Sequence, residues 1–166
     1  IFGEAGRDSE IPSVASKTYA DPAGCVRSFL CLATLIPMVF QALDRGDRPR
    51  IFGDDYPTAD GTCIRDYVHV VDLAEAHVVA AAACEEGGSA RAYNVGRGVG
   101  SSVRQVMDMI SEVLGYDIGA EIVARRPGDP DATFASTDRI SAELGWHATR
   151  DLREMVSSAW SAWQSR

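Results

Sequence analysis

The segment Ile51–His77 reads IFGDDYPTADGTCIRDYVHVVDLAEAH and dominates the interpretation of the whole chain. A short apolar run enters a polar loop in which Pro57, Gly61 and several aspartates are turn formers, so the loop is expected to hold a fixed shape. Arg65 follows at the boundary between this loop and the next apolar stretch. Binding residues often collect at such boundaries, and the segment has the organisation of a ligand clamp.

Arg65 is the first candidate binding residue in this segment. A guanidinium presents a rigid fork of donors that matches phosphate or carboxylate oxygens. The alternative is a surface ion pair with Asp66 or Asp60. For a single arginine that alternative is the simpler one.

Hydrophobic spacing predicts alternating helices and strands along the chain. Strands are expected at 50–52, 67–70, 91–95 and 121–123. Helices are expected at 34–43, from Asp72 with Glu75 as a capping box to Gly87–Gly88, from Ser101 or Ser102 to Gly115, at 137–144, and after Thr149 as cap. The last helix carries an apolar stripe, Leu152, Met155, Val156, Ala159, Trp160 and Trp163, which is expected to be buried. The pattern favours one α/β unit over residues 34–166, preceded by a segment, 1–33, that is hard to assign.

Composition excludes several classes of protein. The 166 residues are 46% hydrophobic, which favours a folded core over disorder, and the net charge of −8 argues against a nucleic-acid partner. The longest uncharged apolar run, Ser28–Leu43, is interrupted by Pro37 and is too short for the ~18 residues of a membrane span. Four cysteines show neither C-x-x-C nor metal-ligand spacing, so free thiols in a reducing cytoplasm are expected, although two disulfides would also be possible.

The segment Ile51–His77 resembles the corresponding stretch of the UDP-glucose 4-epimerases, members of the extended short-chain dehydrogenase/reductase superfamily. Three later stretches resemble the same family in the same order: YNVGRGVGSSV at Tyr93–Val103, ARRPGDP at Ala124–Pro130, and the C-terminal LGWHATRDLREMVSSAWSAWQSR. The resemblance runs from about Thr34 to the C-terminus. It implies an α/β fold that corresponds to the C-terminal, substrate-binding part of an NAD-dependent epimerase.

The family's catalytic Tyr-x-x-x-Lys pair is missing from this sequence. Lys17 is the single lysine, and Ser13 stands four residues before it. A tyrosine with a pKa near ~10 is a poor acid or base at neutral pH without such a neighbour. The resemblance therefore implies that the N-terminal Rossmann half is absent, and truncation, divergence and a disrupted reading frame are all open as causes.

The resemblance also implies a set of residues that bind a UDP-sugar. Phe52, in the strand that starts at Arg50, matches the position that meets the uracil, and Arg65 and Arg126 match the arginines that face the diphosphate. Asp129 matches the acid that accepts a hydrogen bond from the ribose. The expected substrate-binding residues are Thr34, Leu35, Arg50, Phe52, Arg65, Arg126 and Asp129. Thr34 stands where the family has an Asn and lacks the Asn amide. The alternative for Arg126 is a solvated loop residue, and the alternative for Asp129 is a turn former before Pro130.

The glycine loop Gly96–Gly100 is a weaker candidate for a cofactor site. It follows a strand and precedes a helix, but GRGVG does not match G-x-G-x-x-G because the third glycine comes one residue early. A structural role for this loop is favoured over NAD binding. We expect no cofactor and no metal on this chain alone.

Two classes of function remain open at the level of sequence. The resemblance implies an isomerase that interconverts UDP-glucose and UDP-galactose in galactose metabolism, with NAD and as a cytoplasmic homodimer when complete. The missing catalytic pair favours a non-catalytic UDP-sugar-binding module or remnant for this polypeptide. A relative that acts on another nucleotide sugar, a dehydratase or decarboxylase, is a further alternative.

Overall fold

The computed structural model describes residues 17–20, 26–28, 35–85 and 91–166, the first two ranges as backbone only. The helices are α1 Leu35–Asp44, α2 Val70–Glu85, α3 Val103–Leu114, α4 Asp138–Leu144 and α5 Leu152–Gln164. The strands are β1 Lys17–Ala20, β2 Val26–Ser28, β3 Arg50–Phe52, β4 Ile64–Arg65, β5 Ala92–Asn94, β6 Ser101–Ser102, β7 Glu121–Val123 and β8 Ala132–Thr133. The expected α/β character is confirmed.

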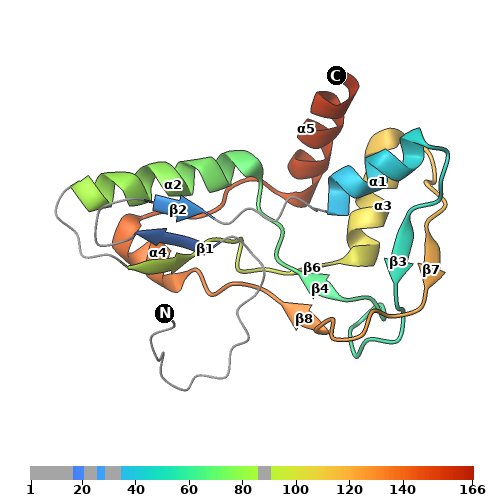
Figure 1. The fold of residues 1–166 in the computed structure, drawn as a ribbon, viewed down its shortest axis with the longest axis horizontal. Helices are drawn as coiled ribbons and strands as arrows, with labels where there is room; N and C mark the ends of the chain where they lie inside the picture. The colour runs from blue at the N-terminus through green and yellow to red at the C-terminus, as the bar shows by residue number, and fades with distance from the viewer. Residues whose placement is uncertain (1–16, 21–25, 29–34, 86–90) are drawn as a thin grey trace.

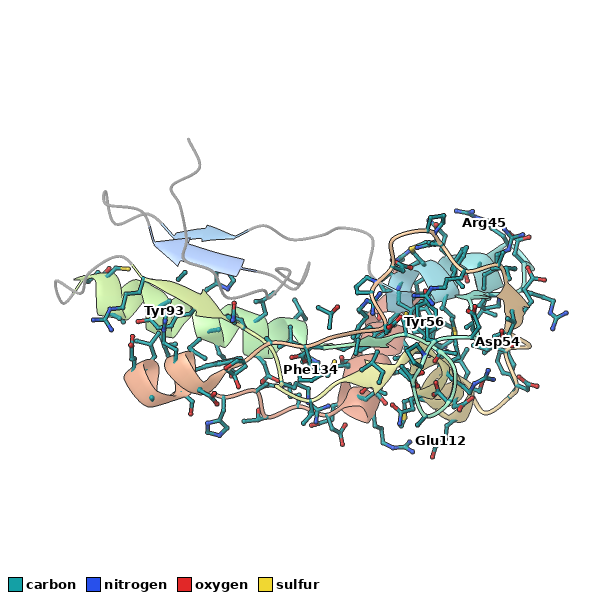
Figure 2. All side chains as sticks on the ribbon, turned by 90° about the horizontal axis from the view of Figure 1, so that it is seen from below. Arg45, Asp54, Tyr56, Tyr93, Glu112 and Phe134 are labelled. Carbon is teal, nitrogen blue, oxygen red and sulfur yellow. The ribbon has the colours of Figure 1, made fainter. Side chains whose placement is uncertain are left out.

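Three small sheets organise the molecule in a row (Figure 1). The sheet β2-β1-β5 lies with α2 and α4 at one end, and the parallel pair β3-β7 lies with α1 and α3 at the other. The sheet β6-β4-β8 joins the two ends, and its central strand β4 is antiparallel to β6 and parallel to β8. Figure 2 shows the same division, with Tyr93 at the first end and Asp54 and Tyr56 at the second.

Each end of the molecule has its own apolar cluster. The larger cluster joins α1, β3, α3 and α5, with Phe40, Val106, Ile110 and Val156 fully buried. Phe40 packs against the rings of Trp160 and Trp163, so the stripe predicted for the last helix does face a core. The smaller cluster joins α2, β5 and α4 through residues such as Leu73, Val95 and Ile140.

The helix α3 follows its sequence signals closely. The Ser102 hydroxyl accepts the Gln105 N–H at 3.1 Å while the Gln105 side chain accepts the Ser102 N–H at 2.9 Å, which satisfies two otherwise unpaired donors. Gly115 ends the helix at φ +78°, a conformation that favours glycine. Gly145 ends α4 in the same way, at φ +64°.

Three of the sequence predictions at helix and strand ends are wrong. The expected strand at 67–70 does not form, because β4 ends at Arg65 and α2 already begins at Val70. Asp72 lies inside the first turn of α2 and is not its cap. Asp151 replaces Thr149 as the cap of α5, and its capping box with Glu154 satisfies the first turn.

A single long-range contact explains two of these errors. The buried Asp72 carboxylate accepts hydrogen bonds from the N–H of Arg150 at 3.0 Å and from the N–H and hydroxyl of Thr149 at 3.3 and 3.1 Å. It also forms an ion pair with the Arg150 guanidinium. Asp72 and Thr149 therefore join α2 to the start of α5, and neither of them caps a helix. The predicted end of α2 at Gly87–Gly88 lies outside the described residues.

Candidate functional site

Two parallel strand pairings define the candidate site, because they hold the two ends of one loop. The pairing β3-β7 places Phe52 opposite Val123, and the Gly53 N–H donates to the Val123 carbonyl at 2.9 Å. The pairing β4-β8 places Arg65 opposite Thr133. The loop 124–131 runs between β7 and β8, so two segments distant from it in sequence meet the same loop.

Arg65 holds one side of this loop. Its Nη1 donates to the carbonyls of Ile64 at 2.7 Å and Pro130 at 2.9 Å, and its Nη2 lies 3.9 Å from an Asp129 carboxylate oxygen. Arg65 and Asp129 are therefore neighbours, although they are far apart in sequence. The alternative ion pair of Arg65 with Asp60 or Asp66 is wrong, since Asp60 binds Thr62 and Ser102 and Asp66 binds backbone N–H groups.

Arg126 lies over Phe52 at the other side of the loop. Its guanidinium carbon is 3.6 Å from the centre of the Phe52 ring, an arrangement in which the ring face attracts the cation. The Asp129 N–H donates to the Arg126 carbonyl at 3.4 Å, so the two residues share a turn. Phe52, Arg65, Arg126 and Asp129 are thus linked through one loop by two contacts, Phe52 with Arg126 and Arg65 with Asp129.

Cys63 and Tyr56 lie beside these residues and were missed as parts of the site. Burial raises the pKa of the Cys63 thiol, and the charges of Arg65, Asp129 and Arg126 all act on it. Burial also raises the pKa of Tyr56, whose ring lies 3.9 Å from the guanidinium carbon of Arg125. A sequence signal existed only for Cys63, which lies two residues before Arg65. Its raised pKa makes the thiol a poor nucleophile.

Two predicted binding residues have contacts elsewhere, and a third is not described. The Arg50 Nε pairs with Glu121 at 2.8 Å across β3 and β7, and the Arg50 side chain is 63% exposed. Leu35 begins α1 and packs on the larger apolar cluster. Thr34 lies outside the described residues.

The glycine loop already has an anion of the protein's own. The N–H groups of Arg97 and Gly98 donate to the Asp66 carboxylate at 2.8 and 3.0 Å. Successive N–H groups of this kind also form the concavities that bind phosphate, and a carboxylate in that place would repel one. The loop therefore does not fit the pyrophosphate of a dinucleotide, and the contact supports its structural interpretation.

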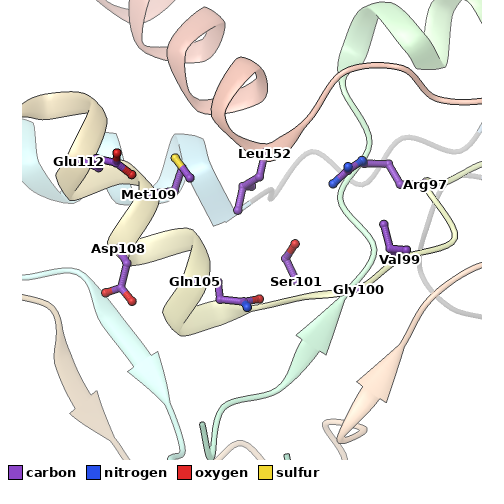
Figure 3. Close-up of a pocket in the computed structure, with 9 residues that line it drawn as sticks. All are labelled: Arg97, Val99, Gly100, Ser101, Gln105, Asp108, Met109, Glu112 and Leu152. Carbon is purple, nitrogen blue, oxygen red and sulfur yellow. The ribbon is translucent and has the colours of Figure 1, made fainter. Parts of the chain in front are cut away.

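A separate open depression of about 430 Å³ lies beside this loop (Figure 3). None of the predicted site residues lines it. Its walls are formed by Arg97, Val99, Gly100, Ser101, Gln105, Asp108, Met109, Glu112 and Leu152.

Within the described ranges there is no group of three or more His, Cys, Asp or Glu side chains that could hold a metal ion. No helix in the same ranges is long and apolar enough to cross a membrane, and the described cysteines, Cys63 and Cys84, are free thiols. Cys25 and Cys31 lie outside the described residues.

Comparisons with known proteins show which class of protein this chain resembles. Residues 30–96 match the NAD dependent epimerase/dehydratase family. The more particular resemblance is to UDP-glucose 4-epimerases. The chain is 47% identical over 129 residues to the enzyme of Corynebacterium glutamicum, covering 76% of this chain and 39% of that protein. It is 45% identical over 171 residues to the enzyme of Azospirillum brasilense, covering 99% and 49%. The family resemblance expected from the sequence is confirmed.

Solved structures give the same relation. A UDP-glucose 4-epimerase crystal structure matches with a TM-score of 0.77 and 40% identity over 81% of this chain and 41% of that one. The enzyme from Bifidobacterium longum, in complex with NAD+ and UDP, matches with a TM-score of 0.71 and 34% identity, covering 89% and 44%. The chain therefore spans less than half the length of these relatives.

Proposed function

We propose that this chain supplies the nucleotide-sugar-binding part of a UDP-glucose 4-epimerase. The observation that carries the proposal is the loop 124–131, which joins Arg126 and Asp129 to Phe52 and Arg65 through two strand pairings. Two guanidinium groups suit a diphosphate, a carboxylate suits a sugar hydroxyl, and an aromatic ring suits a flat base. Sequence identity of 45–47% to UDP-glucose 4-epimerases supports the same substrate class.

The assigned roles follow the chemistry of each side chain. Arg65 and Arg126 bind the diphosphate, Asp129 accepts from the ribose, and Phe52 contacts the uracil after Arg126 turns from its ring toward the phosphates. Thr34, Leu35 and Arg50 are assigned to the uridine end of the site by the resemblance to the epimerases alone. The domain boundary at 33–34 is part of this proposal.

The complete enzyme would interconvert UDP-glucose and UDP-galactose, in galactose metabolism, as a cytoplasmic homodimer that uses NAD. Relatives crystallised with NAD support the choice of cofactor for such an enzyme. In this sequence the glycine loop does not fit NAD and no Tyr-x-x-x-Lys occurs. The N-terminal Rossmann half would therefore supply both the NAD-binding site and the acid/base pair. The chain by itself is then a binding module without activity. A match to a dTDP-glucose 4,6-dehydratase at 20% identity concerns the fold alone.

Calorimetric titration of the chain with UDP, UDP-glucose and uridine tests this function. We expect UDP and UDP-glucose to bind and uridine to bind at least about tenfold more weakly, since each charged hydrogen bond contributes about 1.5–3 kcal/mol. Equal affinity for uridine and UDP would contradict the assignment of Arg65 and Arg126 to the diphosphate. Preference for a dTDP-sugar over UDP-glucose would favour the dehydratase alternative.

A further inference from the structure

Asp66 joins three segments of the chain at the point where β4 ends. Its Oδ1 accepts the Arg97 N–H at 2.8 Å, and its Oδ2 accepts the N–H groups of Gly98 at 3.0 Å and Ala135 at 3.1 Å. Arg97 and Gly98 precede β6, and Ala135 follows β8, so these are the continuations of the two strands that flank β4. The Asp66 carboxylate thus adds hydrogen bonds between the β4 chain and the chains of β6 and β8, one residue beyond Arg65, the last paired residue of β4.

The glycine loop is shaped around this carboxylate. A Cβ at Gly96 would overlap the Asp66 Oδ2 and would lie 3.1 Å from the Ala135 Cβ. Gly98 has φ +71°, which other residues rarely adopt, and this conformation directs its N–H to the carboxylate together with that of Arg97. The two glycines therefore serve a contact with Asp66.

The same contact lies next to the strand pairing that contains Arg65. The Arg65 Nη1 donates to the Pro130 carbonyl at 2.9 Å, and Pro130 belongs to the loop that carries Arg126 and Asp129. The relative position of Arg65 and this loop depends on the short pairing of β4 with β8, which has only two residue pairs, Ile64 with Ala132 and Arg65 with Thr133. The Ala135 N–H on Asp66 secures that register from its far end.

We propose that Asp66 is a positioning residue for nucleotide-diphosphate binding, which sets the place of Arg65 through the β4-β8 register. This inference rests on the proposed function. Among the described residues the Asp66 carboxylate accepts from backbone N–H groups alone, so the proposal gives it no ligand contact and routes its effect through Arg65.

Electrostatics and positioning predict opposite results for Asp66→Asn. Removal of a negative charge next to a diphosphate site would tighten UDP binding if charge alone mattered. The amide, however, keeps one acceptor oxygen and turns its NH2 group toward at least one of the three backbone N–H donors, so the three hydrogen bonds of the carboxylate cannot all persist. Positioning therefore predicts that UDP binds about tenfold more weakly, the effect of one charge-assisted hydrogen bond.

A double-mutant cycle with Arg65→Ala separates this role from general damage. UDP and uridine are titrated into the wild type, Asp66→Asn, Arg65→Ala and the double variant. We expect the UDP affinity to fall in Asp66→Asn, uridine affinity to change by less than about twofold, and Asp66→Asn to add nothing once Arg65 is gone. Arg97→Ala keeps its backbone N–H and is the matched control, with unchanged UDP affinity. Tighter UDP binding in Asp66→Asn, or equal losses in both Arg65 backgrounds, would overturn the proposal.

Crystal structures of the wild type and Asp66→Asn decide the placement of Arg65 without any ligand. We expect the Arg65 guanidinium to leave the Pro130 carbonyl in the variant, and an unchanged Arg65 would refute the inference. If the wild type fails to bind UDP, the proposed function falls while this comparison still decides the role of Asp66. If Asp66→Asn does not fold, Gly96→Ala displaces the same carboxylate from the loop side and takes its place in both experiments.

Discussion

Replacement of Arg65 by alanine removes the cation that the account places at the diphosphate. The Arg65 side chain is 27% exposed, and both hydrogens of its Nη1 are used by the carbonyls of Ile64 and Pro130. The Nη2 is 3.9 Å from Asp129, too far for a hydrogen bond, so within the described part of the chain Nη2 and Nε have donors left for a ligand. Loss of one charge-assisted hydrogen bond costs about 1.5–3 kcal/mol, so the Kd for UDP should rise about 10- to 150-fold.

Isothermal titration calorimetry with UDP measures this change, and circular dichroism checks that the variant is folded. Arg48→Ala is a matched control, because it also replaces an arginine by alanine and changes the net charge equally. Arg48 is exposed and donates to the Gly119 carbonyl at 2.7 Å. Its Kd for UDP should stay within about threefold of the wild type. Equal losses in the two variants would mean that net charge, and not the geometry around Arg65, governs binding.

Three further predictions concern stability, reactivity and catalysis. Burial alone would raise the pKa of Asp72, but hydrogen bonds from Arg150 and Thr149 outweigh it and lower the pKa. The contribution of this group to stability is therefore complete above its unfolded pKa of about 3.9 and is lost as the pH falls through the lower folded value. Asp72→Asn should lower the free energy of unfolding by about 2–3 kcal/mol at pH 7 and by less at pH 3; urea denaturation at the two pH values measures this, and equal losses would contradict it. The Cys63 thiol should react with Ellman's reagent at pH 7.5 at least about tenfold more slowly in the folded chain than in urea, because burial raises its pKa; peptide mapping measures the two rates, and equal rates would contradict the assignment. The purified chain with added NAD should not interconvert UDP-glucose and UDP-galactose, and stoichiometric turnover in a coupled assay would show that acid/base groups other than Tyr-x-x-x-Lys suffice.

Local signals predicted the parts of the fold that local contacts determine. The cap at Ser102, one of the two serines expected, and the end at Gly115 depend on residues within one helical turn. The stripe of α5 faces the larger cluster, with Met155 and Val156 buried and the other four residues partly buried. The beginning of α2 and the cap of α5 were wrong because Asp72 binds Thr149 and Arg150, 77 and 78 residues away. No periodicity in either segment reports that contact.

The candidate site divides in the same way. The resemblance to the epimerases picked out Phe52, Arg65, Arg126 and Asp129, and contacts link them in two pairs. Arg50 was chosen for its strand, but its side chain pairs with Glu121. The carboxylate of Asp66 was considered only as an ion-pair partner, since nothing in the sequence indicates that three backbone N–H groups from two other segments converge on it.

Chemical-shift mapping of the isotopically labelled chain during titration with UDP tests the central claim most directly. The account predicts that the largest changes fall on Phe52, Arg65, Arg126 and Asp129 and saturate together with one Kd. The depression formed by residues such as Asp108 and Met109 is the competing site. Saturating changes confined to that depression, with the four predicted residues unaffected, would contradict the account.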